Sequence, residues 1–222
     1  MPNSLQSEPV AAVLDRLYAQ AEKIDPEVLE PAMAEARRRK GPLDDRELAG
    51  MLRRAFMPVS RDVGHLLYMM VRTSRCRRVI EFGTSFGIST IFLAAALKDS
   101  GGGTLVTTEL EPDKVRRARE HFAEAGLSDI VEVREGDARE TLRDVEPDVD
   151  FVLLDGWKGL YLPVLQLLEP KLRTGSLIIA DDIDLMPEVL TPYLQYVHRE
   201  RSPYFAVKVP MGDGLDVAMW TR

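Results

Sequence analysis

The chain has 222 residues, of which 45% are hydrophobic and 29% charged, and its formal net charge at pH 7 is −7. These values are typical of one globular domain with its own core, and the negative charge argues against nucleic acid or an anionic membrane as a general partner. A single cysteine, Cys76, excludes an intrachain disulfide and a cysteine-based zinc site. Because no apolar run approaches the roughly 20 residues that cross a bilayer and the first residues lack the pattern of a secretory signal, we expect a cytoplasmic protein.

The N-terminal part of the sequence predicts helices. An apolar stripe at helical spacing indicates the first of them: Val10, Val13, Leu14, Leu17 and Tyr18. A second helix is expected to start at Asp25-Pro26 and to stop at Gly41-Pro42, because proline suits a first helical position and glycine suits a helix end. Asp44 is a suitable N-cap for a third helix. The buried face of a fourth, between residues 62 and 71, is expected to carry Leu66, Leu67, Met69 and Met70.

From Arg78 onward, short runs rich in valine, isoleucine and leucine alternate with helical patterns. The runs are RVIEFG, TLVTTEL, IVEV, VDFVLLD and SLIIADD. This alternation predicts βαβ units, and therefore a mainly parallel sheet with helices on both faces. In the tail, two strand-like runs flank Met211-Gly212-Asp213-Gly214, which indicates a hairpin and an antiparallel last strand. We expect an α/β fold in which residues 1–57 are a helical extension, acting as a lid or a dimer surface, and residues 58–222 are the main domain.

Acidic residues follow nearly every predicted strand. They are Glu81, Glu109, Asp137, Asp155, Asp181 and Asp182. Ligands of an open parallel sheet bind beyond the carboxyl ends of its strands. These side chains are therefore the first candidates for a functional site.

The junction after the first strand, EFGTSFGIST, contains a glycine-rich turn. Gly83 and Gly87 allow a tight backbone and a close approach to a ligand, but their spacing is not that of the dinucleotide fingerprint, and the lysine of a phosphate-binding loop is absent. Glu109, which ends the second strand, is placed to accept both hydroxyls of a ribose. The combination indicates a cofactor that contains a nucleoside, and a tight turn without a ligand is the alternative.

Asp155, Asp181 and Asp182 are expected to meet if the fourth and fifth strands are neighbours. Three carboxylates packed together repel and raise one another's pKa, and a divalent cation removes that cost. A donor set made only of oxygens suits Mg²⁺, Mn²⁺ or Ca²⁺ better than zinc. The alternative is that Asp181 and Asp182 cap the following helix, which leaves Asp155 unexplained.

The stretch LLDGWKGLY places a lysine three residues after Asp155. Beside a metal ion, Lys158 would lose its proton more readily and serve as a base. Trp157 offers a flat apolar wall, either for a cofactor ring or for packing. Taken alone, the stretch LLDGWKGLY is also compatible with a solvent-exposed turn.

Together, these segments resemble the class I S-adenosylmethionine-dependent methyltransferases, and among them the metal-dependent O-methyltransferases of the catechol and caffeoyl-CoA type. The resemblance runs from about Phe56 to Trp220. EFGTSFGIST resembles the family's first cofactor motif and TTELEPDKV its ribose-binding motif, whereas LLDGWKGLY and LIIADD resemble its two metal motifs. The last two, in this order and at this spacing, are the more specific signal.

The resemblance implies a Rossmann-like sheet of seven strands, with the seventh antiparallel, and a methyltransferase domain over residues 58–222. It also implies S-adenosylmethionine and a divalent ion, Mg²⁺ or else Mn²⁺ or Ca²⁺, as cofactors. The acceptor would be a small hydroxylated molecule, such as a catechol-like vicinal diol. We expect a homodimer, and the net charge predicts that it binds neither nucleic acid nor membrane.

Residue roles follow from the same resemblance. The methionine end of the cofactor would lie against Glu81, Gly83, Thr84 and Ser89, and its ribose against Glu109. Other parts of the cofactor would be bordered by Val59, Asp137, Asp155 and Trp157. Asp155, Asp181 and Asp182 would ligate the metal, and Lys158 would be the general base.

Two positions depart from the catechol enzymes. Asp182 stands where many relatives have asparagine, which makes the site more acidic, and Gly156 replaces a bulkier residue. Three alternatives remain: a metal-independent methyltransferase that acts on another nucleophile, a non-catalytic protein that binds S-adenosylmethionine, and a nicotinamide-dependent dehydrogenase, for which the glycine spacing is wrong. Chelator sensitivity separates the first from the metal-dependent enzyme, and a methyl-transfer assay over a panel of diols separates the second.

Overall fold

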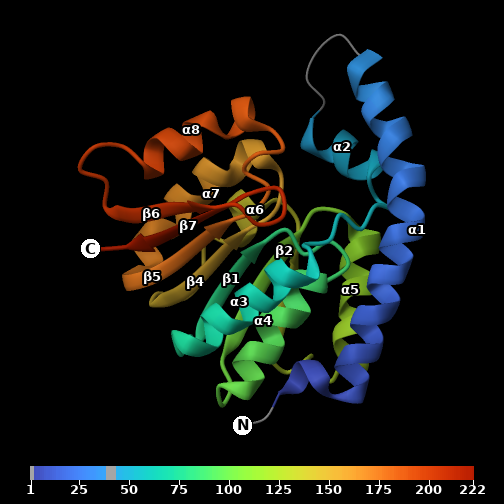
Figure 1. Ribbon diagram of the computed structural model, residues 1–222, viewed down its shortest axis with the longest axis horizontal. Helices are drawn as coiled ribbons and strands as arrows, with labels where there is room; N and C mark the ends of the chain where they lie inside the picture. Colours follow the sequence, from blue (N-terminus) through green and yellow to red (C-terminus); the bar gives the residue numbers. More distant parts are fainter. Residues whose placement is uncertain (1–2, 39–43) are drawn as a thin grey trace.

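The computed structural model of the chain describes residues 3–38 and 44–222, without the side chains at 36 and 37. A twisted sheet runs through the molecule with helices on both faces, and the long first helix lies along one side (Figure 1). The strands are β1 (Arg78–Phe82), β2 (Thr104–Glu109), β3 (Val131–Glu135), β4 (Val149–Leu154), β5 (Leu172–Ala180), β6 (Tyr204–Val209) and β7 (Leu215–Trp220). The helices are α1 (Glu8–Arg38), α2 (Asp45–Met51), α3 (Arg61–Thr73), α4 (Ile88–Asp99), α5 (Pro112–Glu124), α6 (Ala138–Thr141), α7 (Tyr161–Leu168) and α8 (Pro187–Val197), with short 3₁₀ turns at η1 (Ser4–Gln6), η2 (Lys158–Leu160) and η3 (Glu169–Lys171).

In the described chain the sheet has seven strands in the order β3-β2-β1-β4-β5-β7-β6, and β7 is antiparallel to both of its neighbours. β1 is parallel to β2 on one side and to β4 on the other, so the strand order reverses between β1 and β4. Loops that leave two such strands in opposite directions open a crevice beyond their carboxyl ends. The expected Rossmann-like fold, with its C-terminal hairpin, is confirmed.

Alternate residues of each strand enter opposite layers of the core. In β1, Val79 belongs to the cluster that includes α1, α3, α4 and α5, whereas Ile80 belongs to the cluster that includes α6, α7 and α8. The central strand β4 is buried along its whole length, because both of its faces are covered. With both faces occupied, the loops at the ends of the strands are the part of the sheet left to bind ligands.

The predicted start of a second helix at Asp25-Pro26 is wrong, because α1 continues through Pro26 and Pro31 for 31 residues. Instead of capping a helix start, the Asp25 carboxylate accepts the backbone N–H groups of Phe56 and Met57, at 2.6 and 2.8 Å. These contacts and the packing of the C-terminal part of α1 on α2 offset the hydrogen bond that each interior proline removes. The predicted stop at Gly41-Pro42 lies outside the described residues. No helix in the described ranges, α1 included, is long and apolar enough to cross a membrane.

The buried face of α3 differs from the predicted one. Leu67 is buried as expected, but Met69 is 52% exposed, and Leu66 and Met70 are only partly buried. The face that enters the core carries Val63, Gly64, Leu67, Tyr68 and Val71. Two apolar faces were available to this helix, and the close approach of Gly64 to the ring of Phe92 in α4 selects one of them.

Candidate active site

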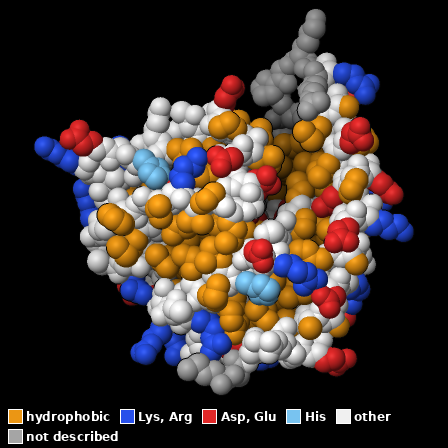
Figure 2. All heavy atoms as spheres, viewed as in Figure 1, with side chains coloured by type: hydrophobic (Ala, Val, Ile, Leu, Met, Phe, Trp, Pro, Cys, Tyr) orange, Lys and Arg blue, Asp and Glu red, His pale blue; other side chains and the backbone are white. Residues whose placement is uncertain are grey.

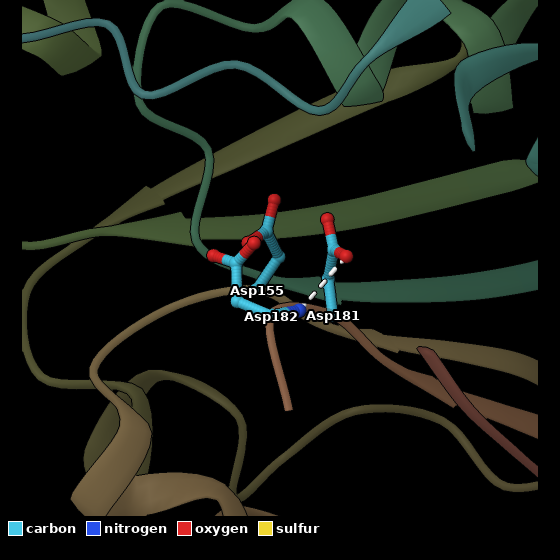
Figure 3. A group of neighbouring side chains, drawn as sticks. All are labelled: Asp155, Asp181 and Asp182. Atoms are coloured by element: carbon cyan, nitrogen blue, oxygen red, sulfur yellow. Dashed lines mark hydrogen bonds between the residues drawn. The ribbon is translucent and has the colours of Figure 1, made fainter. Parts of the chain in front are cut away.

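Three aspartates from two neighbouring strands come together at the carboxyl edge of the sheet (Figure 3). Asp155 directly follows β4, and Asp181 and Asp182 follow β5, which is paired with β4 up to Leu154 and Ala180. One carboxylate oxygen from each lies within 4.8 Å of the others. The spacing is short enough for all three to contact a single ion.

Burial makes this cluster electrostatically unfavourable. Asp181 is buried, and the side chain of Asp155 is 13% exposed. Burial first, and then the charge of Asp181, raises the pKa of Asp155 well above its usual value; burial and the charge of Asp182 raise the pKa of Asp181 to about 6. The fold around these aspartates therefore does not balance their negative charges when all three are ionised.

The capping alternative for Asp181 and Asp182 does not match the local structure. The Asp181 carboxylate accepts the N–H of Asp182 at 2.8 Å, and Asp182 has a left-handed backbone, with φ at 57°. The next helix, α8, begins only at Pro187, and its N-cap position, Met186, has no side-chain hydrogen bond. The loop turns the two carboxylates toward Asp155 instead of toward a helix start (Figure 3).

Lys158 supplies one positive charge to this group. Its Nζ lies 2.8 Å from Asp182 Oδ2 and 3.8 Å from Asp155 Oδ1, and its side chain is 10% exposed. The same nitrogen donates a hydrogen bond to the hydroxyl of Tyr161 at 2.7 Å. Sequence reasoning left Tyr161 without a role, although it lies three residues beyond the lysine, at a spacing that places both on one side of a helical turn.

Two glycines allow the loops after β1 and β4 to touch. Gly83 has φ at 109°, and a Cβ atom on it would lie 2.3 Å from the carbonyl oxygen of Asp155. A Cβ atom on Gly156 would lie 2.5 Å from the ring of Phe82. The glycine at 156, which departs from the catechol enzymes, is therefore matched to a phenylalanine ring that fills the space beside it.

Three of the four residues predicted to line the methionine end of a cofactor, Glu81, Thr84 and Ser89, lie in a buried cluster together with two threonines that were not predicted. The Glu81 carboxylate is fully buried and accepts hydrogen bonds from Ser89, Thr90 and Thr107 at 2.7, 2.5 and 2.6 Å. The hydroxyls of Thr84 and Thr107 lie 2.6 Å apart. Burial, partly offset by these donors, raises the pKa of Glu81 to about 7.

Glu109 fastens the loop that follows β1. One of its oxygens accepts the N–H of Ser85 at 2.8 Å and the other that of Glu111 at 2.9 Å. Ser85 Oγ donates to the carbonyl of Phe56 and accepts from Lys114 Nζ at 3.2 Å. Sequence reasoning missed Lys114, which is buried and whose pKa is lowered by that burial. Its position on the apolar face of α5 is the sequence feature that could have revealed it.

The other predicted cofactor neighbours differ in burial. Asp137 caps α6 by accepting the N–H of Arg139 at 2.8 Å, and it pairs with the guanidinium of the same residue at 2.6 Å. Val59 is buried, and its carbonyl accepts the hydroxyl of Tyr18 from α1 at 3.0 Å. Trp157 is half-buried and packs against the small cluster that joins α1 and α2.

These contacts bring the N-terminal helices over the carboxyl edge of the sheet. Figure 2 shows a hollow between the N-terminal helices and the sheet domain, with acidic and hydrophobic side chains around it. The wall near Trp157 comes from Ala32 of α1 and from Leu52 and Ala55, which follow α2.

Comparison with known proteins assigns the central region to one group. A family model described as a methyltransferase domain matches residues 80–183, from β1 to just past the third aspartate. The chain is 35% identical over 153 residues to catechol O-methyltransferase B of Danio rerio, a match that covers 66% of this chain and 56% of the relative. It is 33% identical over 134 residues to catechol O-methyltransferase of Sus scrofa, a match that covers 57% of this chain and 71% of the relative.

The fold has close counterparts among solved structures. The O-methyltransferase TomG from Streptomyces achromogenes, solved in complex with S-adenosylmethionine, superposes with a TM-score of 0.69 at 23% identity, over 89% of this chain and 99% of that one. At this identity the likeness establishes the fold alone. The matched region spans little more than half of the Danio rerio relative, so activity and substrate have to be argued from the site.

Proposed function

Because this chain belongs to the class I S-adenosylmethionine-dependent O-methyltransferases of the catechol and caffeoyl-CoA type, we propose that it uses a divalent metal ion to methylate one hydroxyl of a small vicinal diol. The cluster of Asp155, Asp181 and Asp182 beside Lys158 is the observation that carries the proposal. Cofactor binding alone does not require three carboxylates whose charges the fold leaves unbalanced. A chelated diol does, because two of its oxygens can share an ion with these acids.

The donors at this edge fit a divalent ion. They are carboxylate oxygens without a cysteine or histidine among them, which suits Mg²⁺, Mn²⁺ or Ca²⁺. Three negative charges face one positive charge, that of Lys158, so a doubly charged ion would bring the group close to neutrality. Asp155, Asp181 and Asp182 would hold it. Such an ion lowers the pKa of a hydroxyl bound to it.

Lys158 is the base in this proposal. Its neutral Nζ accepts the proton of the acceptor hydroxyl, and the resulting oxygen carries the electron pair that attacks the methyl group. Nζ lies 2.8 Å from Asp182 Oδ2, a carboxylate placed to pair with the ammonium that forms when the lysine takes the proton.

Methyl transfer is a single displacement in the proposed cycle. The new bond between oxygen and the methyl carbon forms as the bond between sulfur and that carbon breaks, and S-adenosylhomocysteine leaves without charge. Glu81, Gly83, Thr84 and Ser89 would hold the methionine end of the donor, Glu109 its ribose, and Val59, Asp137, Asp155 and Trp157 its surroundings. Well-oriented reactants gain about 7–11 kcal/mol over free ones, so positioning by these residues accounts for much of the acceleration.

The division into two parts belongs to the same proposal. Residues 58–222 form the methyltransferase domain, and residues 1–57 cover its site. The packing of Trp157 against the cluster of Ala32, Leu52 and Ala55 supports this division of labour. The homodimer expected from the sequence stays a prediction, which light scattering of the purified protein tests.

Chelation tests the proposed function. Purified protein, radiolabelled S-adenosylmethionine and a panel of vicinal diols are incubated with EDTA, and then with excess Mg²⁺. We expect labelled product only after Mg²⁺ is added. Full transfer in EDTA would favour the metal-independent alternative, and binding of S-adenosylhomocysteine without transfer to any diol would favour the non-catalytic one.

A further inference from the structure

Tyr161 joins the lysine of the site to the main chain of an aspartate. Its hydroxyl accepts a hydrogen bond from Lys158 Nζ at 2.7 Å and donates one to the carbonyl oxygen of Asp181 at 3.1 Å. The donor and acceptor functions of one hydroxyl are thus both used. The carboxylate of Asp181 belongs to the acidic cluster. Its carbonyl oxygen binds Tyr161, and Tyr161 binds Lys158, so one residue helps to place both the cluster and the amine.

The Tyr161 ring has little freedom to move. It is fully buried as the first residue of α7, and it makes edge-to-face contacts with Phe82 and Tyr193, whose ring centroids lie 6.3 and 5.9 Å away. Tyr193 is anchored in turn, since its hydroxyl donates to the buried Asp216 at 3.3 Å. Burial raises the pKa of Tyr161 well above its usual value, so the hydroxyl stays neutral.

Lys158 needs such an anchor because its charged partners pull it in other directions. A lysine side chain is flexible, because four methylene groups separate Cα from Nζ. The nearby carboxylates of Asp182 and Asp155 both attract Nζ. A neutral hydroxyl holds the nitrogen without adding charge to a site that already has too much. It also serves the amine in both protonation states, because a neutral amine keeps N–H groups that donate to the same oxygen while the hydroxyl proton stays on the Asp181 carbonyl.

We propose that Tyr161 is a positioning residue that holds Nζ of Lys158 at a fixed point relative to the Asp181 main chain during methyl transfer. The inference rests on the proposed role of Lys158 as the base. Tyr161 itself touches neither acceptor nor cofactor in this scheme. Its hydroxyl acts on turnover only through the lysine.

Tyr161→Phe removes the hydroxyl and keeps the ring contacts. We expect kcat to fall about tenfold or more, since small misplacements of a reacting group cost up to about 100-fold. The KM values for S-adenosylmethionine and the diol are expected to change less than about twofold. Tyr204→Phe is the matched control, because it deletes another buried tyrosine hydroxyl of the same hydrophobic cluster, one that donates to Glu169 at 2.7 Å, and its kcat is expected to stay unchanged. Assays are run below the lower of the two thermal midpoints, so that both variants are folded.

A double-mutant cycle separates this inference from the proposed function. If Tyr161 acts through Lys158, then Tyr161→Phe adds no further loss in a Lys158→Ala background. Full activity of Lys158→Ala alone would overturn the base, and with it the proposed function. A loss in Lys158→Ala together with full activity of Tyr161→Phe, or with an additive double variant, would overturn only the role of Tyr161.

Calorimetry supplies a readout that does not depend on turnover. Mg²⁺ and S-adenosylhomocysteine are titrated into the wild type and Tyr161→Phe, and unchanged affinities for both are expected. A large fall in either affinity would mean that the hydroxyl merely supports the loop, and would overturn the positioning role.

Discussion

Two groups of buried carboxylates lie at the same edge of the sheet, and the fold treats them differently. Glu81 of β1 is surrounded by three hydroxyl donors from α4 and β2. Asp155 and Asp181, at the ends of β4 and β5, face each other and Asp182, with Lys158 as the one cation within salt-bridge distance among the described residues.

The two groups differ in what stabilises them. Hydroxyl groups of the chain itself surround Glu81, whereas the three aspartates need protons or a bound cation. Neutral hydroxyls satisfy the hydrogen bonds of Glu81 but leave its burial cost, so the group tends to keep a proton, with its pKa raised to about 7. Three aspartates with one lysine cannot reach neutrality inside the chain unless protons or a metal ion are added. A buried charge that a fold leaves unmatched points to a ligand more strongly than one that it surrounds with donors.

Removing one acid from the unbalanced group is expected to have the largest effect. Asp181→Asn should lower turnover by at least about 100-fold, equivalent to about 2.7 kcal/mol, and should weaken Mg²⁺ binding measured by calorimetry. In metal-free protein the same change relieves repulsion, so unfolding by urea should show equal or greater stability.

The control for that comparison is Asp184→Asn. Asp184 lies on the same loop but pairs with Lys208 at the surface, at 3.0 Å. Its variant should keep both turnover and Mg²⁺ affinity. If Asp181→Asn instead lost stability and kept its turnover, the aspartates would be structural and the contrast with Glu81 would disappear.

The titration of Glu81 should make the stability of the protein depend on pH. The unfolded chain loses the Glu81 proton near pH 4.5, whereas the folded protein holds it to about pH 7. The folded state binds more protons in that window, so its stability falls as pH rises through it, by about 2–3 kcal/mol between pH 5 and pH 8.

Glu81→Gln removes this titration. Urea unfolding of cofactor-free wild type and variant at pH 5 and pH 8 measures the difference between them. We expect the wild type to lose about 2–3 kcal/mol of unfolding free energy relative to the variant across that range. A difference that does not change with pH would show that Glu81 is ionised throughout, and that its hydroxyls suffice to hold the charge.

Removing one hydroxyl donor from Glu81 should lower the unfolding free energy by a smaller amount. Thr90→Val keeps the shape of the side chain but leaves a Glu81 oxygen with one donor fewer, which is expected to cost about 1–2 kcal/mol of unfolding free energy. Thr73→Val is the matched control, because the Thr73 hydroxyl is exposed and bonds only to carbonyls of its own helix. Equal losses in both variants would mean that the cost reflects helix propensity and not the buried carboxylate.

Periodicity and strand ends predicted most of the fold and the place of the site. Valine-rich runs separated by helical patterns sufficed for the sheet and its order of elements, and the resemblance in LLDGWKGLY and LIIADD to one enzyme family is confirmed. These signals are local: each depends on residues within one strand or one turn. The meeting of Asp155 with Asp181 needed one further assumption, that β4 and β5 pair, which the topology satisfies.

Two of the misses depend on partners distant in sequence. Asp25-Pro26 looks like a helix start, but the amides that Asp25 binds lie more than 30 residues away at Phe56 and Met57. Lys114 stands on the apolar face of its helix, but the hydroxyl that its Nζ contacts, that of Ser85, lies 29 residues earlier in the chain. A local pattern states what a residue prefers, whereas long-range contacts decide which preference is met.

The smallest expected effect comes from a carboxylate that solvent already balances. Glu124 of α5 forms a two-pronged pair with Arg16 of α1, at 2.5 and 2.6 Å, and both side chains are well exposed. Arg16 lowers the pKa of Glu124, the reverse of what burial does to Glu81. Exposed pairs contribute about 0.2–1 kcal/mol, so a cycle of Arg16→Gln, Glu124→Gln and the double variant, followed by urea unfolding, should give a coupling in that range that shrinks in high salt. A larger coupling that persists in high salt would mean that solvent does not screen this exposed pair. Exposure to solvent would then no longer explain why Glu124 differs from Glu81 and from the aspartate cluster.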